Sequence, residues 1–310
     1  MRVTRFEHNP IIRPEMLPGP DGENINGPSL VRMPEWVTGR LGAYHLYFAH
    51  HHGTYIRLAH ADRLEGPWTV HAPGTLRLDQ AVGCVHHIAS PDVHVDDDRR
   101  EIRMYFHGPS ADTATHRQRT FVATSSDGID FTSTGEILGN PYWRAFRHDG
   151  WWYAMVQHGR LYRSRDGLTA FEAGPSPFPG RTLRSKVARR VRRRGPRYTT
   201  PSRHVAVDAT DDGLWVYFTD IGDAPERIRR SFCPTPADWA KWKTSRPIDV
   251  LRPEHDWEGA DLGVRASIAG EAQGPEHALR DPAIFVEDGR RYLLYSVAGE
   301  SGIALAELHE

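Results

Sequence analysis

The chain has 310 residues, a formal net charge of −1 and a pI of about 7.0. This balance gives no reason to expect nucleic acid or another strongly charged partner. No run approaches the roughly 18 consecutive apolar residues that a membrane helix requires. Residues 1–10 contain no apolar core, so we expect no signal peptide. The sequence therefore predicts a cytoplasmic protein. Two cysteines, Cys84 and Cys233, make neither a disulfide framework nor a zinc motif.

One pattern recurs five times along the chain: an aromatic and β-branched run that breaks at a glycine. The five runs are residues 44–53, 102–108, 151–159, 214–222 and 291–299. A further strand-like run follows each of them, and the glycines are 51 to 77 residues apart. Repeats of this period, built of short strands, are typical of propeller blades with about four strands each. The sequence therefore predicts an all-β fold, a single five-bladed β-propeller domain over residues 1–310.

The first strand of each blade is expected just before each run. The candidate segments are residues 25–33, 87–95, 139–147, 202–209 and 280–288. Four of them carry a proline near the start, where no ladder hydrogen bond has to be donated. The last blade ends after three strands, so we expect residues 3–12 to supply its outer strand and to close the ring.

Two segments lie outside this repeat. Residues 181–197 contain nine arginines and lysines, which is typical of a solvated arm. The same charge would also suit a flap over an anionic ligand or a weak attraction to nucleic acid. Residues 252–279 are glycine-rich, acidic and aromatic, and they directly precede the last blade. Long loops on a rigid scaffold often carry function, so we expect this loop near the site.

The innermost strands of a propeller surround a central axis, and the end of this axis where ligands bind is called the mouth here. The strand directions predict which residues meet at the mouth. The innermost strand of a blade begins there, and the second strand ends there. Much of the histidine content of the chain falls on these strand ends, which indicates a polar, ligand-binding mouth. The residues that we expect to bind substrate are Asn26, His51, His52, His87, His107, Trp143, His158 and Arg280.

A resemblance to known enzymes rests on the last blade. Residues 280–296 (RDPAIFVEDGRRYLLYS) resemble the Arg-Asp-Pro element of five-bladed propeller glycoside hydrolases of family 43 and of families 32, 68, 117 and 130. Residues 7–14 (EHNPIIRP) are similar to openings in that group. Family 43 places three carboxylates on three blades, and the resemblance implies that Asp281 is one of them. The corresponding positions of the other blades hold Asn26, Ser90, Asn140 and His204, which departs from the family pattern. Among these relatives, family 117 provides a contrast, because the resemblance there is to a propeller in which a histidine serves as the general acid.

Glycoside cleavage needs a proton donor and a carboxylate that activates water or attacks carbon. Asp281 is the predicted base or nucleophile, because its neighbour Arg280 favours the ionised form. Glu300 lies at the end of the second strand of the same blade and is our first choice of acid, since paired carboxylates raise one pKa. Further candidates for the acid or for a third carboxylate are Glu258, His204 and Asp92.

Two other functions fit the same residues. Histidines from separate blades, including His51, His107 and His158, could hold a divalent cation, which would suit a polysaccharide lyase acting on anionic sugars. A propeller that binds carbohydrate without catalysis is the second alternative. Apart from that cation we expect no cofactor, and we expect a carbohydrate substrate as the partner. The sugar, the stereochemical outcome and the oligomeric state are left open.

Overall fold

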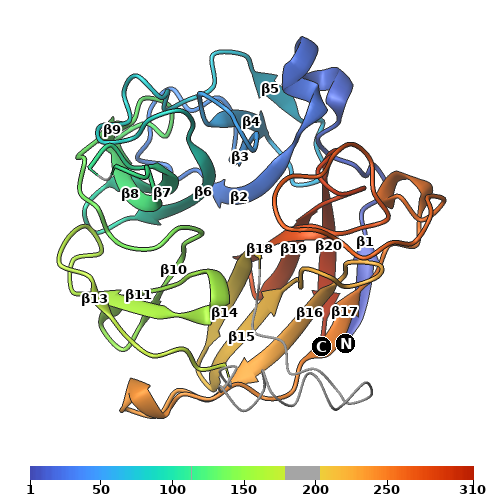
Figure 1. Ribbon diagram of the computed structural model, residues 1–310. Coiled ribbons are helices and arrows are strands. Elements are labelled where there is room, and N and C mark those ends of the chain that lie inside the picture. Colours follow the sequence, from blue (N-terminus) through green and yellow to red (C-terminus); the bar gives the residue numbers. More distant parts are fainter. Residues whose placement is uncertain (113, 179–202) are drawn as a thin grey trace.

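The structure is a computed structural model, and it describes residues 1–112, 114–178 and 203–310. Its strands form five four-stranded antiparallel sheets around a central axis (Figure 1). The predicted five-bladed β-propeller is therefore confirmed. The basic segment 181–197 lies outside the described residues. No helix in the described part of the chain is long and apolar enough to cross a membrane.

The strands follow the predicted order in every blade. Blade 1 contains β2 (Asn26–Arg32), β3 (Tyr44–Ala49), β4 (Arg57–Ala61) and β5 (Thr69–His71). Blade 2 contains β6 (Ala89–Asp96), β7 (Glu101–Pro109), β8 (Gln118–Ser125) and β9 (Thr132–Ser133). Blade 3 contains β10 (Arg144–His148), β11 (Trp151–Met155), β12 (Leu161–Ser164) and β13 (Glu172–Ala173). Blade 4 contains β14 (Val205–Thr210), β15 (Gly213–Phe218), β16 (Ile228–Cys233) and β17 (Ile248–Leu251).

Blade 5 joins the two ends of the chain. It contains β18 (Arg280–Glu287), β19 (Arg290–Ser296), β20 (Ile303–His309) and, as its outer strand, β1 (Arg2–Arg5). The register pairs Arg2 with His309, so the termini lie side by side (Figure 1). The chain then continues past the start of β20, where the backbone N–H of Ile11 donates to Ile303 at 2.8 Å. Closure by the N-terminal segment is confirmed, and the strand itself spans residues 2–5.

The helical elements in the described residues are short 3-10 turns in the connections. They are η1 (Pro14–Met16), η2 (Gly19–Glu23), η3 (Gln157–Gly159), η4 (Trp239–Lys241) and η5 (Asp256–Glu258).

The second strand of each blade is rich in buried apolar and aromatic residues because both of its faces are covered. In β3, Phe48 packs in a cluster with Leu294 of blade 5, whereas Tyr47 packs in a cluster with Met104 of blade 2. Neighbouring side chains of a strand point to opposite faces, so each face of the blade meets a different neighbour. This double burial explains the aromatic runs that mark the repeat.

Three innermost strands carry the same β-bulge at their mouth end. The bulged residues Gly27, Ser90 and Asp281 have φ angles of +62°, +51° and +49°, and a proline follows each. The pairing register skips two residues at each of these points. A bulge re-aims the side chain at its centre. The register also shows that Gly27, and not Asn26, is the counterpart of Asp281 in blade 1.

Candidate active site

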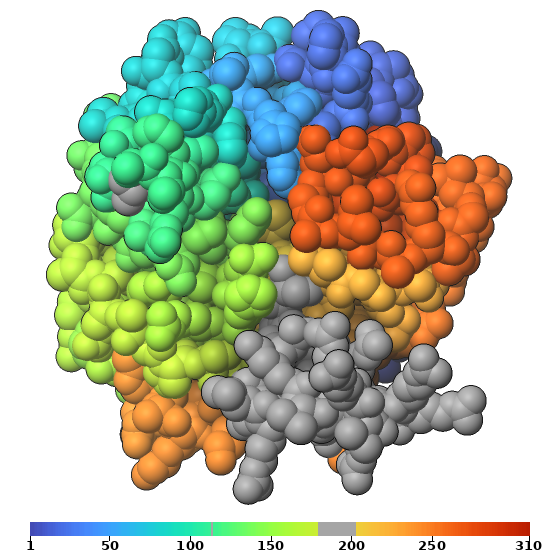
Figure 2. All heavy atoms as spheres, viewed as in Figure 1, coloured from blue at the N-terminus to red at the C-terminus, as the bar shows by residue number. Residues whose placement is uncertain are grey.

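A small polar pocket of about 100 Å³ lies at the mouth of the propeller. All five blades contribute to its wall. The predicted residues that line it are Asn26, His51, His87, His107, His204, Asp281 and Glu300. The loop 252–279 contributes Ala269 and Gly270, and it meets blade 1 near the centre of one face of the molecule (Figure 2). The strand-direction argument therefore brings most of the predicted residues together.

Asp281 lies on the pocket wall with His204 and Ser90. The Nδ1 atom of His204 forms a short hydrogen bond with the Asp281 carboxylate, and its Nε2 atom lies 2.8 Å from the Ser90 hydroxyl oxygen. Ser296 donates to the other oxygen of Asp281 at 3.2 Å. Burial alone would raise the pKa of Asp281, but His204 and the nearby arginines hold it below its usual value. Asp281 is therefore an ionised carboxylate whose charge is directed at His204.

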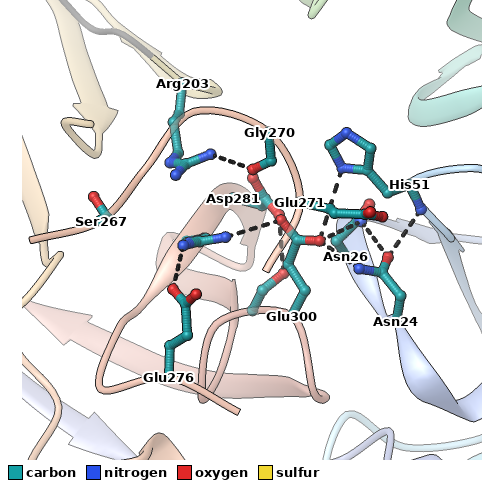
Figure 3. Close-up of polar contacts among 12 residues, drawn as sticks. Asn24, Asn26, His51, Arg203, Ser267, Gly270, Glu271, Glu276, Asp281 and Glu300 are labelled. Carbon is teal, nitrogen blue, oxygen red and sulfur yellow. Dashed lines mark hydrogen bonds and ion pairs between the residues drawn. The ribbon is translucent and has the colours of Figure 1, made fainter. Parts of the chain in front are cut away.

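Glu300 is a second carboxylate at the same mouth, and several side chains fix its position (Figure 3). The amide nitrogens of Asn24 and Asn26 donate to it at 2.5 and 3.4 Å, and Arg280 donates to its other oxygen at 3.2 Å. The Nδ1 atom of His51 lies 3.8 Å away. Glu300 thus stands between blade 1 and blade 5 with its orientation determined.

Arg280 does not line the pocket, contrary to its predicted role in substrate binding. Its side chain is completely buried behind the wall and pairs with Glu300, with Glu226 at 3.2 Å and with Glu276 at 2.5 Å. Arg203, which does line the pocket, pairs with Glu226 at 2.7 Å. Arg280 is a positioning residue that holds glutamates from three segments of the chain.

The loop 252–279 is fastened to blade 4 by Arg203. One guanidinium nitrogen donates to the Gly270 carbonyl at 3.0 Å (Figure 3). Another donates to the Ile268 carbonyl. These bonds keep this part of the loop beside the pocket.

Three histidines of the mouth are kept neutral by burial. Burial lowers the pKa of His51, lowers that of His87 to about 4, and lowers that of His107 well below its ordinary value. Neutral imidazoles provide hydrogen bonds without charge, which suits hydroxyl groups of an uncharged ligand. His52 lies outside this wall, with 60% of its side chain exposed and its ring 5.1 Å from that of His51. Across residues 1–112, 114–178 and 203–310, no three His, Cys, Asp or Glu side chains are grouped to hold a metal ion.

These neutral histidines predict that acid weakens the fold. The unfolded chain protonates His87 near pH 6.5, whereas the folded chain does so near pH 4, so unfolding takes up a proton between these values. The free energy of unfolding should therefore decrease as the pH falls from 6.5 to 4. Urea unfolding at a series of pH values would measure this slope. His87→Gln should make the dependence of the free energy of unfolding on pH shallower, whereas His8→Gln, at an exposed control position, should leave it unchanged. Equal slopes for both variants would contradict the explanation.

Asp92 faces away from the mouth, although it was expected two residues along the strand face from Ser90. The bulge at Ser90 breaks the alternation, so Asp92 and Ser90 lie at different ends of the axis. Asp92 accepts from His94 at 2.9 Å and from the backbone N–H of Ala145 at 2.6 Å in the opposite opening. It therefore ties blade 2 to blade 3.

Two predicted binding residues of blade 3 are replaced by their neighbours. Trp143 is only 2% exposed and packs in the core against Phe171, with ring centroids 4.6 Å apart, so Tyr142 takes its place on the pocket wall. His158 is exposed in the turn η3, where its φ angle is +65°, and Gln157 lines the pocket instead. A one-residue difference in where each turn begins decides both cases.

Glu258 is completely buried away from the pocket, and its partners explain why it is not a candidate acid. It accepts hydrogen bonds from Arg5 at 2.8 and 3.0 Å, from Tyr295 at 3.0 Å and from the backbone N–H of Glu254 at 2.8 Å. It thereby connects the turn η5 with the outer strand β1 and with β19.

Glu258→Gln should consequently affect stability and not turnover. Glutamine cannot accept all of these bonds, and burial of an incompletely paired Arg5 should lower the free energy of unfolding by about 1–3 kcal/mol. Chemical denaturation and turnover per folded molecule would be measured together. A stable variant with strongly reduced turnover would restore Glu258 as a catalytic candidate.

Sequence reasoning placed Ser90 at the position that corresponds to Asp281 but gave it no catalytic or binding role, and it missed Tyr142. Ser90 precedes Pro91 as Asp281 precedes Pro282, and this shared pattern supports the correspondence. The ring of Tyr142 lies 4.5 Å from those of both His107 and His204, a contact between three blades that no local pattern shows.

The fold is that of family-43 glycoside hydrolases and their relatives. A glycosyl hydrolase from Bacteroides ovatus has a TM-score of 0.65 at 12% identity, with 99% of this chain and 93% of that chain covered. The family-43 enzyme from Xanthomonas citri complexed with xylotriose has a TM-score of 0.60 at 11% identity, with 94% and 88% covered. The β-xylosidase/α-arabinofuranosidase CoXyl43 from a compost metagenome, also with xylotriose, has a TM-score of 0.60 at 13% identity, with 94% and 92% covered.

In sequence, the chain is 38% identical over 326 residues to an uncharacterized protein of Acanthamoeba polyphaga mimivirus, covering 99% of this chain and 90% of that protein. The chain belongs to the same family as this viral protein. No family model matches it.

Proposed function

We propose that the protein is a glycoside hydrolase that cleaves a glycosidic bond of a small glycoside or oligosaccharide at the mouth pocket. One observation carries the proposal: a histidine paired with an ionised Asp281 shares a small polar pocket with a second fixed carboxylate, Glu300. Solved proteins of this fold include family-43 enzymes complexed with xylotriose. The neutral imidazoles of His51, His87 and His107 suit an uncharged sugar.

The roles follow from the contacts. Asp281 is buried and bonded to His204, so it acts through that imidazole and not directly on the sugar. A protonated His204 beside an ionised Asp281 donates a proton to the leaving oxygen. Glu300 is the carboxylate that activates water or stabilises the positive charge that develops at the sugar carbon. Compared with the expectation from sequence, His204 replaces Glu300 as the acid, and Glu300 takes the role of base or nucleophile that was expected of Asp281.

A panel of p-nitrophenyl glycosides tests this proposal, and it should include the β-xyloside and the α-arabinofuranoside. The wild-type protein should release p-nitrophenol from at least one member, and the free sugar of that member should inhibit competitively. Folded protein that binds a sugar in calorimetry and cleaves no member would instead support the carbohydrate-binding alternative. Cleavage abolished by EDTA and restored by a divalent cation would support the metal-assisted alternative.

A further inference from the structure

Three side chains of the pocket have the hydrogen-bonding order of a serine nucleophile, its base and the carboxylate that orients the base. The Ser90 hydroxyl meets Nε2 of His204 at 2.8 Å, while Nδ1 of the same ring meets Asp281. The residues come from three blades and are far apart in sequence. A triad of this kind is recognised by geometry and by roles, whatever its order along the chain.

The backbone at Ser90 provides a second observation. Its φ angle of +51° is uncommon for a residue with a side chain, and such conformations cluster at functional sites. Glycine occupies the equivalent place in blade 1, so the bulge does not itself require serine. A Cβ atom on Gly27 would lie only 3.2 Å from Cα of Ser90, which shows how closely the two bulges approach. The strained turn presents the hydroxyl of Ser90 to the pocket.

Donors for a developing oxyanion lie on the same wall. His107 is 3% exposed, and its Nδ1 atom has no hydrogen-bond partner among the described residues. Burial raises the pKa of Tyr142, so its hydroxyl keeps its proton and can donate. The rings of Tyr142 and His204 are 4.5 Å apart. Tyr142 therefore lies next to the triad, and the ring of His107 lies 4.5 Å from that of Tyr142. Acyl transfer needs donors of this kind to stabilise negative charge.

We propose that Ser90 is the nucleophile of a carboxylic-ester hydrolase activity in this pocket. Ser90 Oγ attacks the ester carbonyl carbon as its proton passes to Nε2 of His204. The ester C–O bond then breaks, His204 gives that proton to the departing alcohol, and an acyl-Ser90 remains. Water attacks the acyl carbon as its proton passes to His204. The Ser90–acyl bond then breaks, His204 returns that proton to Ser90 Oγ, and the carboxylic acid is released. Asp281 stabilises the protonated imidazole in both halves.

The pocket defines the class of ester. A cavity of about 100 Å³ with neutral histidines on its wall suits a short, uncharged acyl group on a neutral alcohol such as a sugar hydroxyl. The proposal does not depend on glycoside cleavage. Both activities would use His204 and Asp281, but only ester hydrolysis forms a covalent bond to Ser90.

Labelling with a fluorophosphonate probe, followed by peptide mass spectrometry, tests the nucleophile. The wild-type protein should carry the adduct on Ser90 and should hydrolyse p-nitrophenyl acetate with an initial burst of p-nitrophenol. Ser90→Gly should lose the adduct and the burst, and glycine suits the φ angle at this position. Asp281→Asn should slow labelling by up to about 10⁴-fold. The control Ser231→Ala removes a buried hydroxyl that has no hydrogen-bond partner within the described chain, and should be labelled like the wild type.

Three results would overturn the proposal: no adduct on Ser90 in folded wild-type protein, an adduct only on other residues, or hydrolysis of p-nitrophenyl acetate by Ser90→Gly at the wild-type rate. The glycoside panel uses other substrates, so a negative result for the esterase proposal does not decide the glycosidase proposal, which that panel tests separately.

Discussion

Asp281→Asn is expected to lower turnover of a cleaved glycoside by about two to four orders of magnitude. Asparagine keeps the size of the side chain and tolerates a φ angle of +49°, so the bulge should survive. It has no charge to stabilise a protonated His204, and its amide does not hold the imidazole in the required tautomer. Values of kcat and kcat/KM measured across a pH series would show the loss of turnover. They would also show a changed pH dependence, because the variant stabilises protonated His204 less.

Asp92→Asn is the matched control for this experiment. Asp92 is also buried and also paired with a histidine, but it lies in the opposite opening of the axis. The control should keep wild-type turnover. If both variants lose activity equally, the effect is structural; if neither loses activity, Asp281 has no role in the reaction.

Arg280→Met should cause the largest loss of stability. The substitution fills similar space but leaves the buried side chains of Glu226, Glu276 and Glu300 without their shared cation. Removing one partner of a buried ion pair typically costs about 3–5 kcal/mol, because the remaining charge stays buried. Urea unfolding at neutral pH would measure the decrease, and turnover should also fall because Glu300 loses a donor.

The exposed pair of Arg290 with Glu307 offers a control for charge removal on the same blade. Arg290→Met should have a far smaller effect on unfolding, since solvent screens an exposed ion pair. Equal midpoints of urea unfolding for the two variants would show that the Arg280 cluster contributes no more to stability than an exposed ion pair does.

The blade repeat could be predicted because it follows from local chemistry. Residues such as Tyr47 and Phe48 are apolar in succession since each faces a different neighbouring blade, and a glycine marks the end of such a run. Closure by the N-terminal segment, expected over residues 3–12 and formed by residues 2–5, followed from counting strands in the last blade. The direction of the strands then placed His51, His107 and Glu300 at one mouth.

The errors have a common cause in backbone detail. Period-two alternation placed Asp92 beside Ser90, but the bulge with its positive φ angle rotates the strand between them. The turns of blade 3 begin one residue earlier than expected. Tyr142 and Gln157 therefore line the pocket in place of Trp143 and His158. Such shifts depend on packing between blades, which the sequence of one blade does not contain.

The bonds of His204 to Ser90 and Asp281 join blades 2, 4 and 5 and could not be predicted for a similar reason. Their formation depends on how far each innermost strand is displaced along the axis. No local pattern in the sequence specifies these displacements, so only the folded ring reveals that the three side chains meet.

A crystal structure of the Asp281→Asn variant, soaked with a glycoside that the wild-type protein cleaves, tests the location of the reaction most directly. We predict that the sugar occupies the mouth pocket, with its leaving oxygen within hydrogen-bond distance of Nε2 of His204 and its ring beside Glu300. A sugar bound in the opposite opening, next to His94 and Phe285, or on the outer strands of the blades would contradict this assignment.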